Sequence, residues 1–85
     1  MEPLIIDVRE SAEYSTGHVE GSINIPPSEL IEGAKALKDI PKDTPIILYC
    51  RSGSRSQVAI NLLRQQGFNN LTNGINQQNV EKNYL

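Results

Sequence analysis

The residue order around position 50 constrains the fold more than any other part of the chain. Residues 46–49 are uniformly apolar, which is typical of a central strand of a parallel sheet that is buried on both faces. Cys50 follows directly, and a short loop that contains Gly53 then leads into an amphipathic pattern at about residues 55–66, which Gly67 is expected to end. The order predicts a strand, a tight loop and a helix, with a cysteine at the carboxyl end of the strand.

Three other segments have strand patterns. Residues 4–6 form a brief apolar run, and residues 23–25 alternate before Pro26, which cannot extend a central strand. Phe68 and Leu71 indicate a last short strand. Strands that alternate with helices predict an α/β domain with a mainly parallel central sheet flanked by helices. The length of 85 residues predicts one domain over residues 1–85.

Two further helices are predicted from caps and apolar spacing. Ser11 is expected to cap a helix of one or two turns, and Ser28 a longer one. The apolar positions at helical spacing in the longer helix are Leu30, Ile31, Ala34 and Leu37. The inner stripe expected for the helix at 55–66 consists of Val58, Ala59, Leu62 and Leu63. In the polar tail after Gly74, Val80 is the expected anchor.

Composition argues against several classes of protein. The formal net charge of −2 with scattered basic residues predicts no nucleic-acid partner, and the lack of a long apolar run predicts no membrane segment. One cysteine and one histidine are too few ligands for a typical zinc or iron centre, so no metal and no cofactor are expected. The N-terminal segment does not resemble a signal peptide, which favours a cytoplasmic location, or a periplasmic one if a signal peptide has been removed.

Cys50 is the candidate nucleophile. Backbone N–H groups converge in a tight strand-to-helix loop, and the start of a helix adds partial positive charge, so an anion is stabilised there. Together with Arg51 and Arg55, these groups are expected to lower the pKa of the thiol, and the thiolate is the attacking species in covalent catalysis. A lone cysteine at the end of a buried strand is often a core residue, but the loop that follows Cys50 favours the reactive interpretation.

Asp7, Arg9 and His18 are interpreted as supporting residues rather than catalysts. Asp7 and Arg9 can pair with each other or with neighbouring loops, and His18 is expected to hydrogen-bond a loop, with general-base catalysis as the alternative. Ser28 is interpreted as a helix cap and not as a nucleophile.

Two segments resemble the signatures of the rhodanese family. Residues 7–26 resemble its first signature and residues 49–56 its active-site loop, in the family's order and spacing. The chain looks most like the short single-domain form, including the phage-shock-protein-E type. It departs from many members at Asn73-Gly74, where they have two adjacent glycines followed by a tryptophan.

The resemblance implies a thiosulfate sulfurtransferase. In this family, sulfane sulfur moves from thiosulfate, or from a persulfide donor, to cyanide or a thiol, so Cys50 would carry it as a persulfide. A carrier protein with a thiol is a further implied partner. The loop that would bind substrate and persulfide consists of Arg51, Ser52, Gly53, Ser54 and Arg55.

Other functions stay open. A cysteine-dependent phosphatase or arsenate reductase also uses a cysteine loop closed by arginine, but its loop is one residue longer than the four residues between Cys50 and Arg55. A non-catalytic rhodanese-like binding module is a second alternative, against which the retained Cys50 argues, and redox sensing is a weaker third. The sequence does not identify the physiological donor, the acceptor or the oligomeric state.

Overall fold

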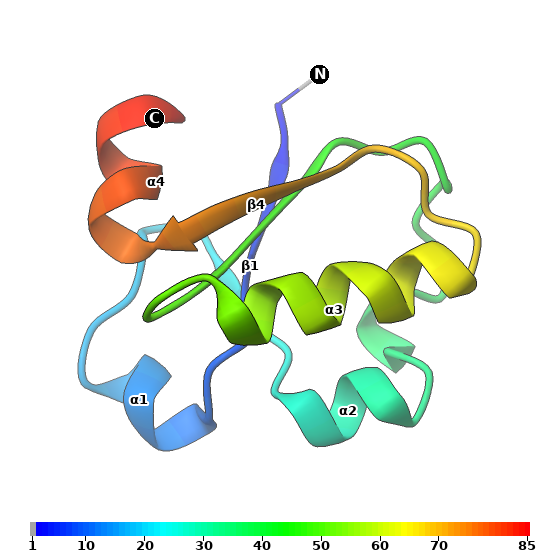
Figure 1. Cartoon of the computed structure of the whole chain (residues 1–85), viewed down its shortest axis with the longest axis horizontal. Coiled ribbons are helices and arrows are strands. Elements are labelled where there is room, and N and C mark those ends of the chain that lie inside the picture. Colours follow the sequence, from blue (N-terminus) through cyan, green and yellow to red (C-terminus); the bar gives the residue numbers. More distant parts are fainter. Residues whose placement is uncertain (1) are drawn as a thin grey trace.

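A parallel sheet forms the centre of the computed structural model, which describes residues 2–85 (Figure 1). The four strands are β1 (Leu4–Asp7), β2 (Ile23–Asn24), β3 (Ile46–Cys50) and β4 (Leu71–Asn76). They lie in the order β2-β1-β3-β4, and every neighbouring pair is parallel. Each residue of β3 is buried, as the apolar run predicts for an inner strand. The predicted α/β class with a parallel sheet is confirmed.

The two faces of the sheet are covered differently. One face packs against α2 (Pro27–Ile31), the 3-10 helix η1 (Lys35–Leu37) and α3 (Ser54–Gln65), and its core includes Leu48 and Cys50. The other face lies under α4 (Gln77–Asn83) and the chain that follows α1 (Ser11–Ser15). Its smaller core contains Ile5, Val19, Ile47, Tyr49 and Val80. Figure 1 shows α2 and α3 on one side of the strands and α4 on the other.

The prediction of a longer helix after Ser28 is wrong about where that helix ends. The helix ends at Ile31, which is 72% exposed. Ala34 and Leu37 are buried, but they belong to the separate 3-10 helix η1 and its N-cap. Gly33 and Ala34 both have positive φ, +111° and 51°, so the chain reverses between the two short helices. Ser28 lies inside the helix, whose N-cap is Pro26.

Three smaller expectations also need correction. The N-cap of α1 is Glu10 rather than Ser11, because Glu10 and Glu13 form a reciprocal capping box. Val58 is 59% exposed, and Ile60 takes its expected place in the buried stripe of α3. Phe68 is buried but precedes β4.

Gly67 follows α3 with φ +100°, and Val80 is fully buried, both as predicted. Across residues 2–85, none of the helices is long and apolar enough to cross a membrane.

Candidate active site

The loop after β3 encloses the sulfur of Cys50. The strand ends at Cys50, α3 begins at Ser54, and the backbone N–H of Gly53 donates to Cys50 Sγ at 3.1 Å. Gly53 is the N-cap of α3 and has φ +93°, a left-handed conformation that glycine adopts without strain. This turn directs the N–H groups at the start of the helix toward the sulfur, which is the arrangement that the sequence predicts.

These donors lower the pKa of Cys50. Burial of the thiol raises the pKa, but hydrogen bonds from the Ser56 hydroxyl and from the backbone N–H groups of Ser56, Ser52 and Gly53 outweigh it and bring the pKa from 9.0 to about 7. A thiol with that pKa is roughly half ionised at neutral pH. The predicted direction agrees with the structure, and its leading causes are hydrogen-bond donors of the loop.

The two loop arginines have different surroundings. Arg55 donates to both carboxylate oxygens of Glu13 on α1, at 2.7 and 3.1 Å, and thereby links the start of α3 to α1. This bidentate contact lowers the pKa of Glu13 to about 2. Arg51 is exposed, and so are Ser52 and Ser54, whose hydroxyls lie 3.3 Å apart. Of the two arginines, only Arg51 has a side chain free to meet a ligand above the loop.

A polar pocket of about 350 Å³ opens above Cys50. Its wall combines the end of β3, the start of α4 and two cationic side chains, and it consists of Arg9, Cys50, Arg51, Asn76, Gln77 and Gln78. None of these lining residues is Asp or Glu, so the described wall favours an anionic ligand. The sequence did not single out Asn76, Gln77 or Gln78, because the polar tail gave no sign that it returns as a helix beside the cysteine.

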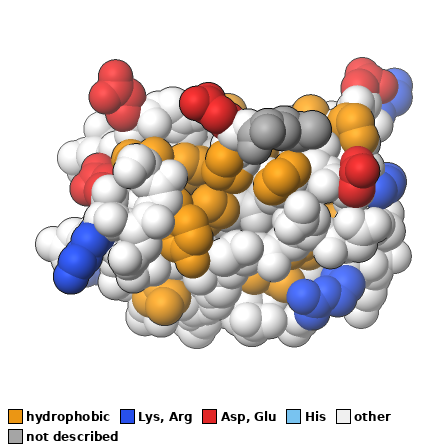
Figure 2. All heavy atoms as spheres, turned by 90° about the horizontal axis from the view of Figure 1, so that it is seen from above, with side chains coloured by type: hydrophobic (Ala, Val, Ile, Leu, Met, Phe, Trp, Pro, Cys, Tyr) orange, Lys and Arg blue, Asp and Glu red, His pale blue; other side chains and the backbone are white. Residues whose placement is uncertain are grey.

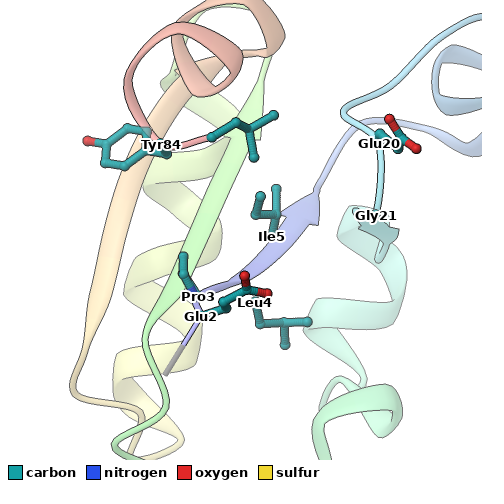
Figure 3. A pocket seen from close by; sticks show the side chains of 8 residues that line it. Glu2, Pro3, Leu4, Ile5, Glu20, Gly21 and Tyr84 are labelled. Atoms are coloured by element: carbon teal, nitrogen blue, oxygen red, sulfur yellow. The ribbon is translucent and has the colours of Figure 1, made fainter.

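A second cavity of about 420 Å³ lies on the face that carries α4 and the beginning of β1 (Figure 3). Its wall is largely apolar and consists of Glu2, Pro3, Leu4, Ile5, Glu20, Gly21, Tyr84 and Leu85. Figure 2 views the molecule from the side of the N-terminus, and hydrophobic side chains gather near the middle of that face. None of the predicted site residues lines this cavity, so it is not the site that the cysteine loop forms.

Asp7 and Arg9 form a buried ion pair beside the pocket. Asp7 accepts hydrogen bonds from Arg9 Nε at 2.9 Å and Arg9 Nη2 at 2.6 Å, and a third from the Tyr49 hydroxyl at 3.0 Å. Arg9 Nη2 also donates to the carbonyl of Gly17 at 2.7 Å. The hydrogen bond to Asp7 raises the pKa of Arg9 despite its burial. The pair therefore keeps the Arg9 guanidinium protonated and fixed in position at the pocket wall, with Asp7 as its counter-charge.

His18 follows α1 by three residues and does not line the pocket of Cys50. Its Nδ1 is 2.8 Å from the carbonyl oxygen of Tyr14, and its ring stacks on the Tyr14 ring with centroids 3.6 Å apart. Because a carbonyl only accepts, Nδ1 carries the proton. The contacts of His18 are thus those of a residue that hydrogen-bonds and packs on α1.

Two polar residues near the sulfur were not among the predicted site residues. Ser56 is fully buried, and its Oγ lies 3.6 Å from Cys50 Sγ. Asn73 of β4 accepts from Ser56 Oγ at 2.6 Å and donates to the carbonyl of Gly53 at 3.0 Å. Ser56 stands within the loop signature and could have been noticed there. Asn73 is brought to the loop only by the pairing of β4 with β3.

This fold and site define a class, a small parallel α/β domain with a thiol enclosed at the carboxyl end of an inner strand. The family model described as Rhodanese-like domain matches residues 1–78. The structure described as rhodanese with anions from E. coli has a TM-score of 0.80 and 30% sequence identity, and the match covers 91% of this chain and 89% of that one. The chain belongs to the rhodanese-like domain family.

Curated relatives are longer than this chain. A sulfurtransferase from Allochromatium vinosum is 37% identical over 70 residues, which are 82% of this chain and 63% of that protein. The adenylyltransferase and sulfurtransferase uba4 from Ogataea parapolymorpha is 40% identical over 73 residues, which are 80% of this chain and 17% of that protein. The chain therefore spans less than two thirds of these relatives.

Proposed function

We propose that this chain is a sulfurtransferase that carries sulfane sulfur as a persulfide on Cys50. The observation that carries the proposal is the enclosed sulfur, which receives the Gly53 N–H at 3.1 Å and whose pKa is lowered to about 7. The sulfurtransferase names of relatives and the family membership support the same reaction class. The short single-domain form, including the phage-shock-protein-E type, is the form we propose.

The first half of the reaction transfers sulfur to the enzyme. The Cys50 thiolate attacks the outer sulfur of thiosulfate, a new S–S bond forms, and the bond between the two sulfurs of thiosulfate breaks. Sulfite leaves with the electron pair of that bond, and the anionic persulfide remains on Cys50. Arg9 and Arg51 line the pocket where the anionic donor enters, so their charge favours its binding.

The second half returns Cys50 to its thiolate. Cyanide, or the thiolate of an acceptor, attacks the outer sulfur of the persulfide, and the electron pair of the S–S bond returns to Cys50. The products are thiocyanate or a new persulfide, and the freed thiolate is again held by the loop donors. The pocket is open to solvent, which suits a small acceptor or the thiol of a carrier protein.

Intact mass spectrometry tests the persulfide directly. After incubation with thiosulfate, the protein should gain the mass of one sulfur atom, and cyanide or a thiol should remove it. Cys50→Ser is the control and should gain nothing, because a hydroxyl is a far weaker nucleophile at this pH. A wild-type mass that is unchanged by thiosulfate and by other persulfide donors would rule out the carrier role.

The phosphatase alternative is tested with an aryl phosphate. Four residues separate Cys50 from Arg55, and Glu13, an acid on the neighbouring helix, is already bound to Arg55. The described pocket wall offers no carboxylic acid to protonate a leaving group. We therefore expect negligible hydrolysis, and efficient hydrolysis that depends on Cys50 would replace the sulfurtransferase proposal.

A further inference from the structure

Asn73 lies on β4 immediately before a bulge in that strand. Leu48 pairs with Asn73 and Tyr49 with Ile75, so Gly74 is an additional residue between two paired positions. Asn73 pairs with Leu48, whose side chain packs in the core on the α3 side of the sheet, so Asn73 points to the same side. There it bonds to residues at the start of α3.

The hydrogen bonds of Asn73 define which way its amide points. The backbone N–H of Ile75 donates to Asn73 Oδ1 at 3.0 Å, and Asn73 Nδ2 donates to the carbonyl of Gly53 at 3.0 Å. The flipped amide would place its NH2 group against the Ile75 N–H and its oxygen against the Gly53 carbonyl, so neither bond could form. Oδ1 therefore faces Ser56 Oγ, 2.6 Å away, and because Oδ1 can only accept, the Ser56 hydroxyl donates to it.

The Ser56 hydroxyl has one proton and three neighbours that could accept it. These are Asn73 Oδ1 at 2.6 Å, the Gly53 carbonyl at 3.1 Å and Cys50 Sγ at 3.6 Å. The Gly53 carbonyl already accepts from Gln57 N at 3.0 Å and from Asn73 Nδ2. While Ser56 donates to Asn73, its oxygen can only accept from the Cys50 S–H. To donate to a sulfur anion, Ser56 must give up its bond to Asn73.

We propose that Asn73 is a positioning residue that holds the Ser56 hydroxyl away from the sulfur and so favours the protonated form of Cys50. When the thiol loses its proton to solvent, the hydroxyl turns from Asn73 to the sulfur anion. Ionisation of the nucleophile is thereby linked to a hydrogen bond made by β4. The proposal rests on the proposed function only in taking Cys50 as the reacting group.

The hydrogen bonds described for Asn73 involve none of the charged groups around the sulfur. Arg9 and Arg51 line the pocket from the end of β1 and from the loop, and α4 contributes only amides to it. On the neighbouring helices, Arg55 of α3 is bound to Glu13 of α1. On the neighbouring strand β1, Asp7 is bound to Arg9. A change in ionisation that requires Ser56 can therefore be assigned to the hydroxyl.

The test is the pH dependence of Cys50 alkylation by iodoacetamide in the full chain. Asn73→Ala should lower the midpoint by about half to one pKa unit below that of the wild type, because Ser56 then donates to the thiolate without giving up a hydrogen bond to Asn73. Ser56→Ala should raise the midpoint. In the Ser56→Ala background, adding Asn73→Ala should change it no further.

Two more variants keep the test interpretable. Asn73→Gly should give the same lowered midpoint, and it places at this position the residue that many members of the family have. Gln57→Ala is the matched control, because Gln57 Oε1 contacts Asn73 Nδ2 at 3.4 Å while the Asn73–Ser56 bond stays intact, so its midpoint should equal that of the wild type.

An unchanged or raised midpoint in both Asn73 variants would overturn the proposal. An equal shift with and without the Ser56 hydroxyl would also overturn it, because Asn73 would then act through the loop backbone. Alkylation requires no sulfur donor, whereas the persulfide test depends on one. Failure of this inference and failure of the sulfurtransferase assignment are therefore distinguishable.

Discussion

Two carboxylate–arginine pairs flank the cysteine loop, and they differ in their burial. Asp7 is fully buried and Arg9 is 9% exposed, and the pair lies between β1, the Tyr49 hydroxyl and the Gly17 carbonyl. The side chains of Glu13 and Arg55 are 27% and 35% exposed, and they join two helices at the surface. In both pairs the guanidinium makes hydrogen bonds to both oxygens of the carboxylate. Comparing the stability that each pair contributes therefore tests how burial changes the contribution of a carboxylate–arginine pair.

Burial makes the Asp7–Arg9 pair, the inner pair, costly to break. Exposure to solvent makes the Glu13–Arg55 pair, the outer pair, easy to replace. A buried charge that loses its partner cannot recover hydration, whereas an exposed charge exchanges its partner for water. The inner pair also supplies hydrogen bonds that other buried groups need. It therefore contributes to the shape of the pocket, while the outer pair adjusts how closely α1 holds α3.

The largest effect is expected from Asp7→Asn. It leaves the buried guanidinium of Arg9 without a counter-charge, and we expect the free energy of unfolding to fall by about 3–5 kcal/mol. Urea denaturation measures the loss. The double variant Asp7→Asn with Arg9→Met should be more stable than Asp7→Asn alone, since it removes the unpaired charge. A single variant as stable as the wild type would show that burial adds nothing to this pair.

A smaller loss is expected from Tyr49→Phe. The hydroxyl donates to Asp7 Oδ2 and accepts from the backbone N–H of Val19, both at 3.0 Å. Removing it leaves a buried N–H without its partner, and we expect a loss of about 1–3 kcal/mol in the free energy of unfolding. Tyr14→Phe is a matched control, because the Tyr14 hydroxyl donates one partly buried hydrogen bond, to the Ser22 carbonyl at 2.6 Å, and its removal leaves no N–H without a partner, so it should lose less.

Glu13→Gln should have a still smaller effect. The pair with Arg55 is partly exposed, so we expect less than about 1 kcal/mol of destabilisation, and less again at high salt. Urea denaturation at low and high ionic strength measures both quantities. A loss as large as that of Asp7→Asn would remove the distinction between the inner and outer pairs.

The smallest expected effect is the pH dependence of that outer contribution. The pKa of Glu13 is lowered from 4.5 to about 2 by Arg55, so its stabilisation is present above about pH 4.5 and is lost as the pH falls toward 2. The stability difference between wild type and Glu13→Gln should shrink over that interval. A difference that stays constant from about pH 6 to about pH 2 would show that the carboxylate charge is not responsible.

Much of the site was predictable because its signals are local. A uniformly apolar run, a cysteine, a glycine loop and an amphipathic helix are contiguous, and they predicted β3, the enclosed sulfur and α3 in the right order. Prediction from local sequence was less reliable where apolar spacing that favours a helix competed with residues that end one. The apolar spacing after Ser28 favoured one long helix, but the positive φ of Gly33 and Ala34 ended it early.

The sequence by itself determined the class of fold and the identity of the candidate nucleophile, since strand burial, helix periodicity and loop chemistry depend on neighbouring residues. Only the tertiary structure decided which charged side chains pair and which distant residues lie beside Cys50. Arg55 binds Glu13, and Asn73 contacts Ser56, across separations in sequence that no periodic pattern encodes. Gly74 is another example of such a long-range constraint. A Cβ at this position would lie 2.6 Å from Val80 Cγ2, and this contact exists only because α4 packs on the sheet.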